Sequence, residues 1–235
     1  MTKIVFPLAL IAALAFGAPA GAESGSASVL IVHGIPGRDV AAALDPLLPV
    51  DVLVAGKYCL LQGFTFGSIA GPFTIPAGTY PVAISLANPL NPCSNAPVIS
   101  GNVTVPSSGY AAVVAALSTN GTPTAEAYPI DVSSVGAGQQ RFVVAHAANA
   151  PGVKVTIASV DGEKEKKNFN LTPGQEGAAE LAARNAFTVS LSKGKTSIVS
   201  TQVSPGNQGV AFVAAVGTAA SGSVTLLSKT IPNAF

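Results

Sequence analysis

Two histidines, His33 and His146, are the side chains best suited to acid–base catalysis or metal binding, because imidazole titrates near neutral pH. Each ends a short apolar run, and a turn with a proline follows, at Pro36 and at Pro151. The two residues therefore hold the same position in two copies of a repeat. Equivalent positions of separate copies seldom converge on one site, so we expect each ring to bond a neighbouring turn. We predict no metal site and no cofactor.

Other polar residues show spacings that occur in enzymes. Ser190 and Lys193 match the S-x-x-K pattern of penicillin-binding enzymes, but that chemistry needs the serine at the start of a helix. Here the alternation of polar and apolar residues places Ser190 on a strand. Asp39, Asp45 and Asp51 could line a cleft, although scattered surface carboxylates are the commoner arrangement. No nucleophile converges with a base, so the sequence predicts a protein without catalytic residues.

The chain contains an internal repeat, in which four segments recur in the same order. Four segments of the first copy have counterparts in the second, and the spacing between counterparts shortens along the chain. The first copy therefore carries two insertions, one around residues 44–49 and one around residues 88–93. The matched segments are 28–33 with 141–146, 50–54 with 153–157, 80–84 with 187–191, and 109–116 with 209–216.

The repeat units have the pattern of β-sandwiches. Apolar residues alternate with polar ones at 80–86 and 187–191, as in half-buried strands, and Gly, Pro, Asn and Ser clusters separate about seven strands per copy. Residues 38–44 are the best helix candidate. Residues 177–184 have helical propensity, but their alignment with residues 71–75 predicts a strand. The expected fold is all-β, with two tandem antiparallel sandwiches, immunoglobulin-like or transthyretin-like, at 23–135 and 136–235.

Cys59 and Cys93 are the only cysteines, and an even pair in an exported chain favours a disulfide over two buried free thiols. The bridge would fix an insertion that only the first copy carries. Loops on rigid scaffolds commonly provide binding specificity. We therefore predict interaction loops at the two insertions, with these candidate residues: Leu44, Asp45, Leu47, Leu48, Asn88, Leu90, Asn91 and Asn95.

Charge is scarce and unevenly placed. Charged residues make up 10% of the chain and hydrophobic ones 49%. Residues 23–135 carry six acidic and two basic residues, whereas residues 136–235 carry five acidic and nine basic ones. The imbalance arises by chance, or it docks the two copies within one chain, or it joins chains head to tail. The formal net charge is +1 and no basic patch with aromatic residues occurs, which excludes a nucleic-acid partner.

Residues 1–22 have the features of a signal peptide. Lys3 gives a positive start, residues 4–16 are apolar, and Ala20-Gly21-Ala22 is a small-x-small cleavage site. The apolar stretch is shorter than the ~20 residues that span a bilayer. We expect an exported protein without a stable transmembrane anchor, located at the cell surface, in the periplasm or outside the cell.

The motifs of the first copy resemble those of a known family. His33-Gly34-x-Pro36, Val50-Asp51-Val52, Phe66-Gly67 and the segment from Ile75 to Tyr80 are similar to the tandem repeats named domain of unknown function 4397. The second copy is degenerate and has Ala183-Arg184-Asn185 in place of the Pro-Ala-Gly turn. The resemblance implies an exported or cell-surface protein with a sandwich fold. It implies no catalytic residues, because none is established for that family.

Two function classes follow. The first is a non-enzymatic secreted or cell-surface interaction or structural module, which contacts a protein or surface polymer, or another copy of itself, through loops and strand edges. The second is an accessory carbohydrate-binding protein. The absence of Trp and the presence of only four Tyr lower the second expectation, since sugar-binding platforms use aromatic rings. A hydrolase is the least favoured class.

Overall fold

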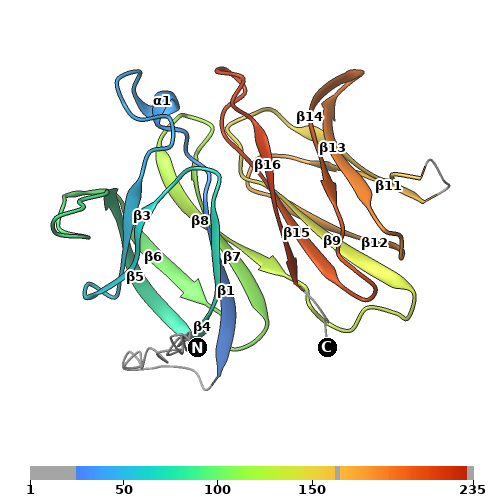
Figure 1. Cartoon of the computed structure of the whole chain (residues 1–235), viewed down its shortest axis with the longest axis horizontal. Coiled ribbons are helices and arrows are strands. Elements are labelled where there is room, and N and C mark those ends of the chain that lie inside the picture. Colours follow the sequence, from blue (N-terminus) through green and yellow to red (C-terminus); the bar gives the residue numbers. More distant parts are fainter. Residues whose placement is uncertain (1–24, 162–164, 232–235) are drawn as a thin grey trace, which may run out of the picture.

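A computed structural model describes residues 25–161 and 165–231 (Figure 1). The predicted signal peptide, residues 1–22, lies outside these ranges. The elements of the first sandwich are β1 (Ser26–His33), α1 (Gly37–Val40), β2 (Val50–Val54), β3 (Tyr58–Phe64), β4 (Ile69–Pro76), β5 (Gly78–Leu86), β6 (Pro97–Val105), β7 (Tyr110–Leu117) and β8 (Pro123–Ile130). Those of the second sandwich are β9 (Gln139–His146), β10 (Val153–Ser159), β11 (Lys166–Leu171), β12 (Glu176–Ala182), β13 (Phe187–Lys193), β14 (Thr196–Val203), β15 (Val210–Val216) and β16 (Thr225–Ile231).

The two sandwiches share one topology, which confirms the predicted all-β repeat. The first consists of the sheets β4-β1-β7-β8 and β3-β2-β5-β6, and the second of β12-β9-β15-β16 and β11-β10-β13-β14. Counterpart strands occupy counterpart places in these orders. The predicted boundary between residues 135 and 136 falls in the connection from β8 to β9, and as a boundary between domains it stays a prediction.

Three details differ from the expectation. Each sandwich has eight strands in the described residues. Most neighbours are antiparallel, but β1 runs parallel to β7 and β9 runs parallel to β15. The helix is limited to the four residues Gly37–Val40, because Ala41 already has an extended backbone with φ −156°. The strand expected at 177–184 is present as β12.

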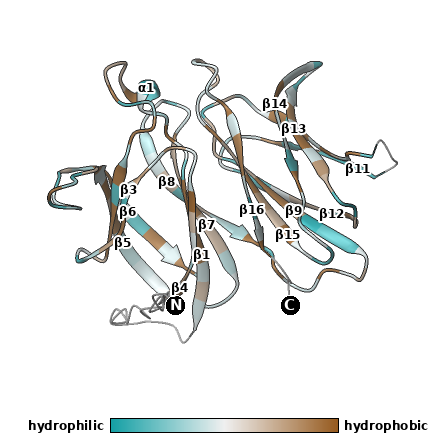
Figure 2. Ribbon diagram, in the orientation of Figure 1, coloured by the Kyte–Doolittle hydropathy of each residue, from teal (hydrophilic) through white to brown (hydrophobic). Residues whose placement is uncertain are grey.

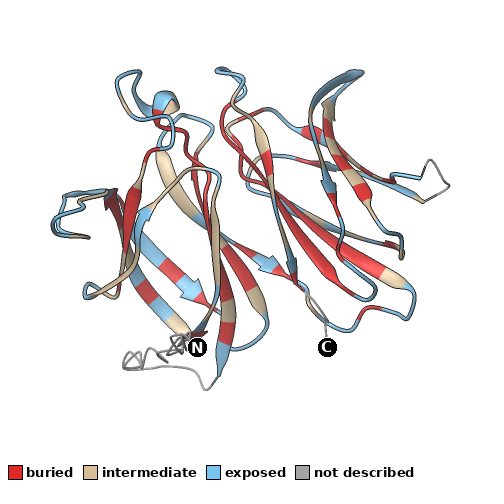
Figure 3. Cartoon of the chain, viewed as in Figure 1, coloured by how far each residue is buried: buried red, intermediate tan, exposed pale blue. Residues whose placement is uncertain are grey.

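The two sandwiches pack against each other through a shared apolar core. Leu30, Val32 and Val114 of the first sandwich cluster with Val143 and Phe212 of the second. Strands β1, β7, β9 and β15 are therefore buried on both faces, and every residue of β15 is buried (Figure 3). The same strands are largely hydrophobic (Figure 2). Continuous apolar runs are expected for strands covered on both sides.

This contact corrects one of the readings of the charge imbalance. Within the described residues, one ion pair joins the two parts of the chain, between Arg141 and Asp131 at 3.1 Å beside the connection from β8 to β9. The contact surface itself is apolar. Burial of apolar side chains, and not opposite charge, therefore docks the two sandwiches, since apolar area removed from water contributes about 25 cal/mol per Å². Head-to-tail assembly between chains stays a prediction.

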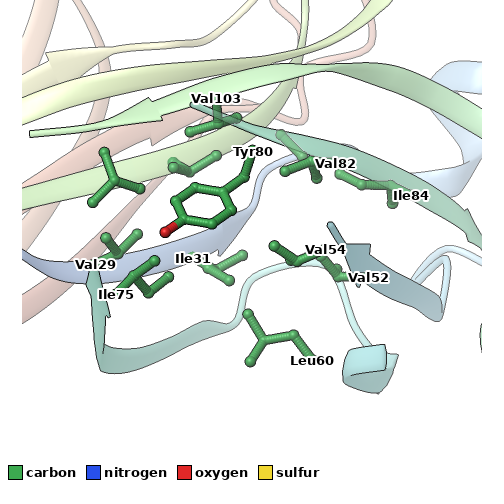
Figure 4. A pocket seen from close by; sticks show the side chains of 13 residues that line it. Val29, Ile31, Val52, Val54, Leu60, Ile75, Tyr80, Val82, Ile84 and Val103 are labelled. Atoms are coloured by element: carbon green, nitrogen blue, oxygen red, sulfur yellow. The ribbon is translucent and has the colours of Figure 1, made fainter. Parts of the chain in front are cut away.

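The interiors of the two sandwiches are filled differently. In the second, the rings of Phe142 and Phe187 meet edge to face, with centroids 5.0 Å apart. The corresponding positions of the first hold Val29 and Tyr80, and a cavity of about 40 Å³ remains beside them. Figure 4 shows the Tyr80 ring among the valines and isoleucines that line this cavity. The Tyr80 hydroxyl donates to the carbonyl of Pro76 at 3.0 Å, which satisfies its polar end.

Candidate functional site

An apolar notch opens at one end of the first sandwich, where the loop between β1 and β2 meets the end of β5 and the start of β6. Its volume is about 80 Å³, and Ile35, Leu44 and Leu48 of the loop lie across it from Ile84 and Ile99. Three further lining residues reach solvent: Val40 is 46% exposed, Leu86 36% and Val98 53%. Exposed apolar side chains gathered around a concave surface are typical of interaction sites.

His33 positions the loop that forms one wall of the notch. Its buried ring donates from Nε2 to the carbonyl of Leu48 at 2.8 Å, and Nδ1 accepts from the backbone N–H of Ile35 at 3.3 Å. Burial lowers the pKa of His33, although the bond to Leu48 acts in the opposite direction. A neutral imidazole with both nitrogens engaged is a structural element here, as the sequence predicted. His146 also bonds a neighbouring turn in the second sandwich, donating from Nε2 to the carbonyl of Pro151 at 3.0 Å, but its buried Nδ1 has no hydrogen-bond partner within the described residues.

The loop is tightly closed. The Gly37 N–H donates to the Pro46 carbonyl at 3.1 Å, and a β-carbon on Gly37 would lie 1.9 Å from the Asp45 carbonyl oxygen. Asp45 also accepts the Leu47 N–H at 2.8 Å through its side chain, which is the bonding of an Asx turn. Glycine is therefore required where the two ends of the loop meet. The closure turns the Leu47 side chain outward, where it is 54% exposed.

The second sandwich supports this loop from outside. Asp39 of α1 accepts a hydrogen bond from the Ser223 hydroxyl at 2.5 Å, and the Gly34 carbonyl accepts the Gly217 N–H at 3.2 Å. A β-carbon on Gly34 would lie 2.6 Å from a methyl group of Val216, so the two backbones approach closely there. The notch thus has a wall that is braced by the other half of the molecule.

Asp51 organises the loop between β5 and β6, residues 87–96, which contains the second predicted loop, residues 88–96. Asp51 is a buried residue, 1% exposed, whose carboxylate lies on the outer side of β2 and accepts three backbone N–H groups. These come from Gly63 at 2.9 Å, Asn88 at 3.0 Å and Cys93 at 2.9 Å. Burial alone would raise the pKa of Asp51, but the three hydrogen bonds outweigh it and lower the pKa below 3.8. Asp51 is therefore not one of the scattered surface acids that the sequence suggested.

The predicted disulfide is present and ties the same loop to β3. Cys59 and Cys93 are joined, with their Cα atoms 5.8 Å apart. Within the loop, Asn88 accepts the N–H groups of Leu90 and Asn91 at 3.1 and 3.2 Å, and Asn95 donates to the Leu86 carbonyl at 2.9 Å. The asparagine side chains are thus used to shape the loop. Leu90 is left 98% exposed at its tip.

The structure brings the two predicted loops together but changes the roles of their residues. The Ala87 N–H donates to the Pro49 carbonyl at 2.9 Å, which joins the bases of the loops. Leu44, Leu47 and Leu90 present apolar surface, whereas Leu48 is buried. The side chains of Asp45, Asn88 and Asn95 form hydrogen bonds at their own loops, and Asn91 does so through its backbone.

Sequence reasoning missed Val40, Leu86 and Val98. Val40 falls within the helix candidate 38–44, and Leu86 ends the alternating segment 80–86, and neither pattern predicts an exposed apolar side chain at these positions. Each of the three lies at or next to the end of an element, where fewer neighbouring residues cover a side chain. That position is the feature that could have predicted their exposure. Val98 follows Pro97, the first residue of β6.

Neither a metal cluster nor a membrane-spanning helix is found in the described residues. Over residues 25–161 and 165–231, no group of three or more His, Cys, Asp or Glu side chains is arranged to hold a metal ion. In the same ranges, no helix has the length and apolar character that crossing a bilayer requires. Ser190, the serine of the S-x-x-K pattern, lies on strand β13 as the alternation predicted.

Comparison with known proteins adds limited information. Among curated proteins there is no match. The Bacillus anthracis TIE protein aligns with 83% of this chain at 12% identity and a TM-score of 0.26. This chain spans 33% of that protein. A structure titled "putative cell adhesion protein from Bacteroides ovatus" aligns with 88% of this chain and 98% of its own at 7% identity and a TM-score of 0.28. Likenesses this low carry no argument about fold or function.

A family model gives the firmer result. It matches residues 27–156, which contain all of β2 to β9 together with most of β1 and the first part of β10. The match includes His33, Asp51 and both cysteines, the residues that shape the two loops beside the notch. The chain belongs to the family described as domain of unknown function (DUF4397).

Proposed function

We propose that this protein is a non-enzymatic, exported interaction module whose first sandwich binds a protein partner at the apolar notch. One observation carries the proposal. Seven large apolar side chains are exposed in the described residues, and five of them belong to the notch and the two loops beside it. These five are Val40, Leu47, Leu86, Leu90 and Val98. Water is excluded from such a surface when a partner covers it, which favours association.

The size of the notch favours a protein partner over a small ligand. Pockets for drug-sized molecules measure about 300–1,000 Å³, whereas the notch has about 80 Å³. One apolar side chain of a partner, inserted between Leu44 and Leu86, suits this volume better. Apart from the His33 imidazole, no aromatic ring lines the notch, so it offers no platform for sugar stacking. The disulfide supports the exported location, since such bonds persist in oxidising compartments.

The test compares two double variants in a pull-down from the native cell envelope. Val40→Ser with Leu90→Ser removes apolar surface beside the notch. The matched control, Val160→Ser with Ile198→Ser, removes exposed apolar side chains from the second sandwich, where Val160 is 47% exposed and Ile198 37%. We expect the first pair to lose the captured partner and the control to retain it. Equal capture by both variants, or equal loss, would contradict the proposal.

A further inference from the structure

The outer face of the sheet β11-β10-β13-β14 is an open, polar surface. Along β10, Val153, Val155 and Ile157 are buried, whereas Lys154 and Thr156 point to the other side. The other three strands repeat this alternation, and their register forms continuous rows across the sheet. We call this surface the outer face; it consists of Lys154, Thr156, Lys166, Asn168, Asn170, Thr188, Ser190, Ser192, Ser200 and Gln202 together with Ala158.

The outer face is largely polar, although Ile198 of β14, which alternates with Ser200 and Gln202, adds an exposed apolar side chain. Its polar groups are short hydroxyls, carboxamides and ammonium groups, and its described residues include no carboxylate and no aromatic ring. The Thr156 hydroxyl donates to the Asn168 side-chain oxygen at 2.7 Å across the strand pair. Ser190 donates to the Thr156 carbonyl at 3.4 Å. These bonds hold polar groups in a fixed array on a rigid sheet.

Positive charge lies at both ends of the outer face. Lys154 lies in a row with Asn170 and Ser192, beside the turn from β13 to β14 that carries Lys195, and Lys166 lies at the other end in a row with Ala158. All three lysines are exposed, and none has an ion-pair partner within the described residues. The whole segment 136–235 has nine basic and five acidic residues. An anionic ligand is therefore attracted to the outer face.

The corresponding face of the first sandwich is different. There the loop of residues 87–96 folds over the outer side of β2, and the buried Asp51 carboxylate holds it in place. In the second sandwich, Lys154 occupies the position of Asp51, and no counterpart of that loop is present. Only the second sandwich thus leaves this face uncovered within the described residues (Figure 1).

We propose that the outer face binds an acidic, carboxylate-bearing polysaccharide. Lys154, Lys166 and Lys195 pair with its carboxylates, while the hydroxyl and carboxamide rows exchange hydrogen bonds with its sugar hydroxyls. A charged polymer can bind in this way without aromatic stacking, which removes the objection that the chain lacks Trp. A polyphosphate matches the lysines but donates no hydrogen bonds to the Thr156 and Ser190 oxygens, so the polar rows favour a polysaccharide.

The test measures binding of polygalacturonate at low ionic strength by calorimetry, with neutral dextran and polyphosphate as comparison polymers. We expect the wild-type protein to bind polygalacturonate and not dextran. The triple variant Lys154→Gln, Lys166→Gln, Lys195→Gln should bind at least about tenfold more weakly, because three exposed ion pairs are lost. Thr156→Val keeps the shape and charge but loses the hydroxyl, so binding should weaken about threefold.

Matched controls separate this proposal from general charge attraction and from the notch. Lys57→Gln and Lys229→Gln remove lysines outside the outer face, and each should leave binding unchanged. The notch variant Val40→Ser with Leu90→Ser should also bind polygalacturonate normally, so the two proposals fail independently. Three outcomes would overturn the inference: no binding by the wild type, equally tight binding of polyphosphate, or an unaffected Thr156→Val variant. Thermal unfolding of each variant confirms that its fold is intact.

Discussion

At the scale of single residues, Asp51 shows how one buried carboxylate can shape a candidate site. It joins the hairpin at Gly63 to the loop at Asn88 and Cys93, through three backbone N–H groups. From sequence alone, Asp51 could not be distinguished from an exposed acid, because the residues that cover it are remote in the chain. The role of His33 was easier to predict, because the same residue ends the counterpart strand as His146.

Replacing Asp51 with Asn should reduce the free energy of unfolding at neutral pH. An amide cannot accept three backbone N–H groups, so at least one buried donor loses its partner, at a cost of about 1–3 kcal/mol. The loss should depend on pH. Since the folded pKa of Asp51 lies below its ordinary value of 3.8, the carboxylate stabilises the fold fully above that value, and less as the pH falls through the folded pKa.

Urea unfolding of the wild type and of Asp51→Asn, across neutral to strongly acidic pH, checks this prediction. The difference between the two proteins should be largest near neutrality and should shrink in acid. Asp161→Asn serves as the control, because its carboxylate is 54% exposed. A difference between wild type and Asp51→Asn that stays constant across the whole range would show that the carboxylate charge is not involved.

At the scale of elements, the sequence predicted the strands that follow a repeated pattern, but not the features that depend on packing between distant segments. The strands β2, β5, β7 and their counterparts follow from alternation and from the repeat, and the disulfide follows from an even cysteine pair. The parallel pairing of β1 with β7 could not be read from either strand, since an apolar run is compatible with several neighbours. The shortness of α1 also escaped prediction, because the tight closure between Gly37 and Pro46 overrides local propensity.

The disulfide should stabilise the protein mainly by constraining the unfolded chain. The cysteines are 34 residues apart, and closing a loop of that length contributes about 4 kcal/mol in the chain-entropy model. The double variant Cys59→Ser with Cys93→Ser should show a loss of this order in urea unfolding. It should also detach the loop that presents Leu90. A variant as stable as the oxidised wild type would show that Asp51 alone holds the loop.

At the scale of the whole molecule, the sequence predicted two units but not the nature of their contact. The opposite charges of the two halves were visible in the residue counts and suggested electrostatic docking. The shared core was not visible, because strands such as β7 and β15 look the same whether one face or both faces are buried. Whether one or both faces of a strand are buried depends on the sheets that pack against it, and only the structure shows these sheets.

The shared core predicts that the two sandwiches unfold together. Phe212 is fully buried at the contact, and Phe212→Ala should cost about 3–5 kcal/mol. Calorimetry of the wild type should show one transition, and that transition should move to lower temperature as a whole in the variant. Two transitions in the wild type, with only the second one moved by Phe212→Ala, would show that each sandwich is stable by itself.

The close approach at Gly34 and Val216 has a consequence for the ancestry and engineering of this protein. Tandem domains that fold independently can be gained, lost or exchanged one at a time, because the loss of one domain leaves its neighbours folded. Here, removal of either half would expose the apolar contact surface of the other half to water. It would also break the hydrogen bond between Ser223 and Asp39 of α1. Recombination in evolution, and any fusion protein made in the laboratory, must therefore keep the two sandwiches together as one unit.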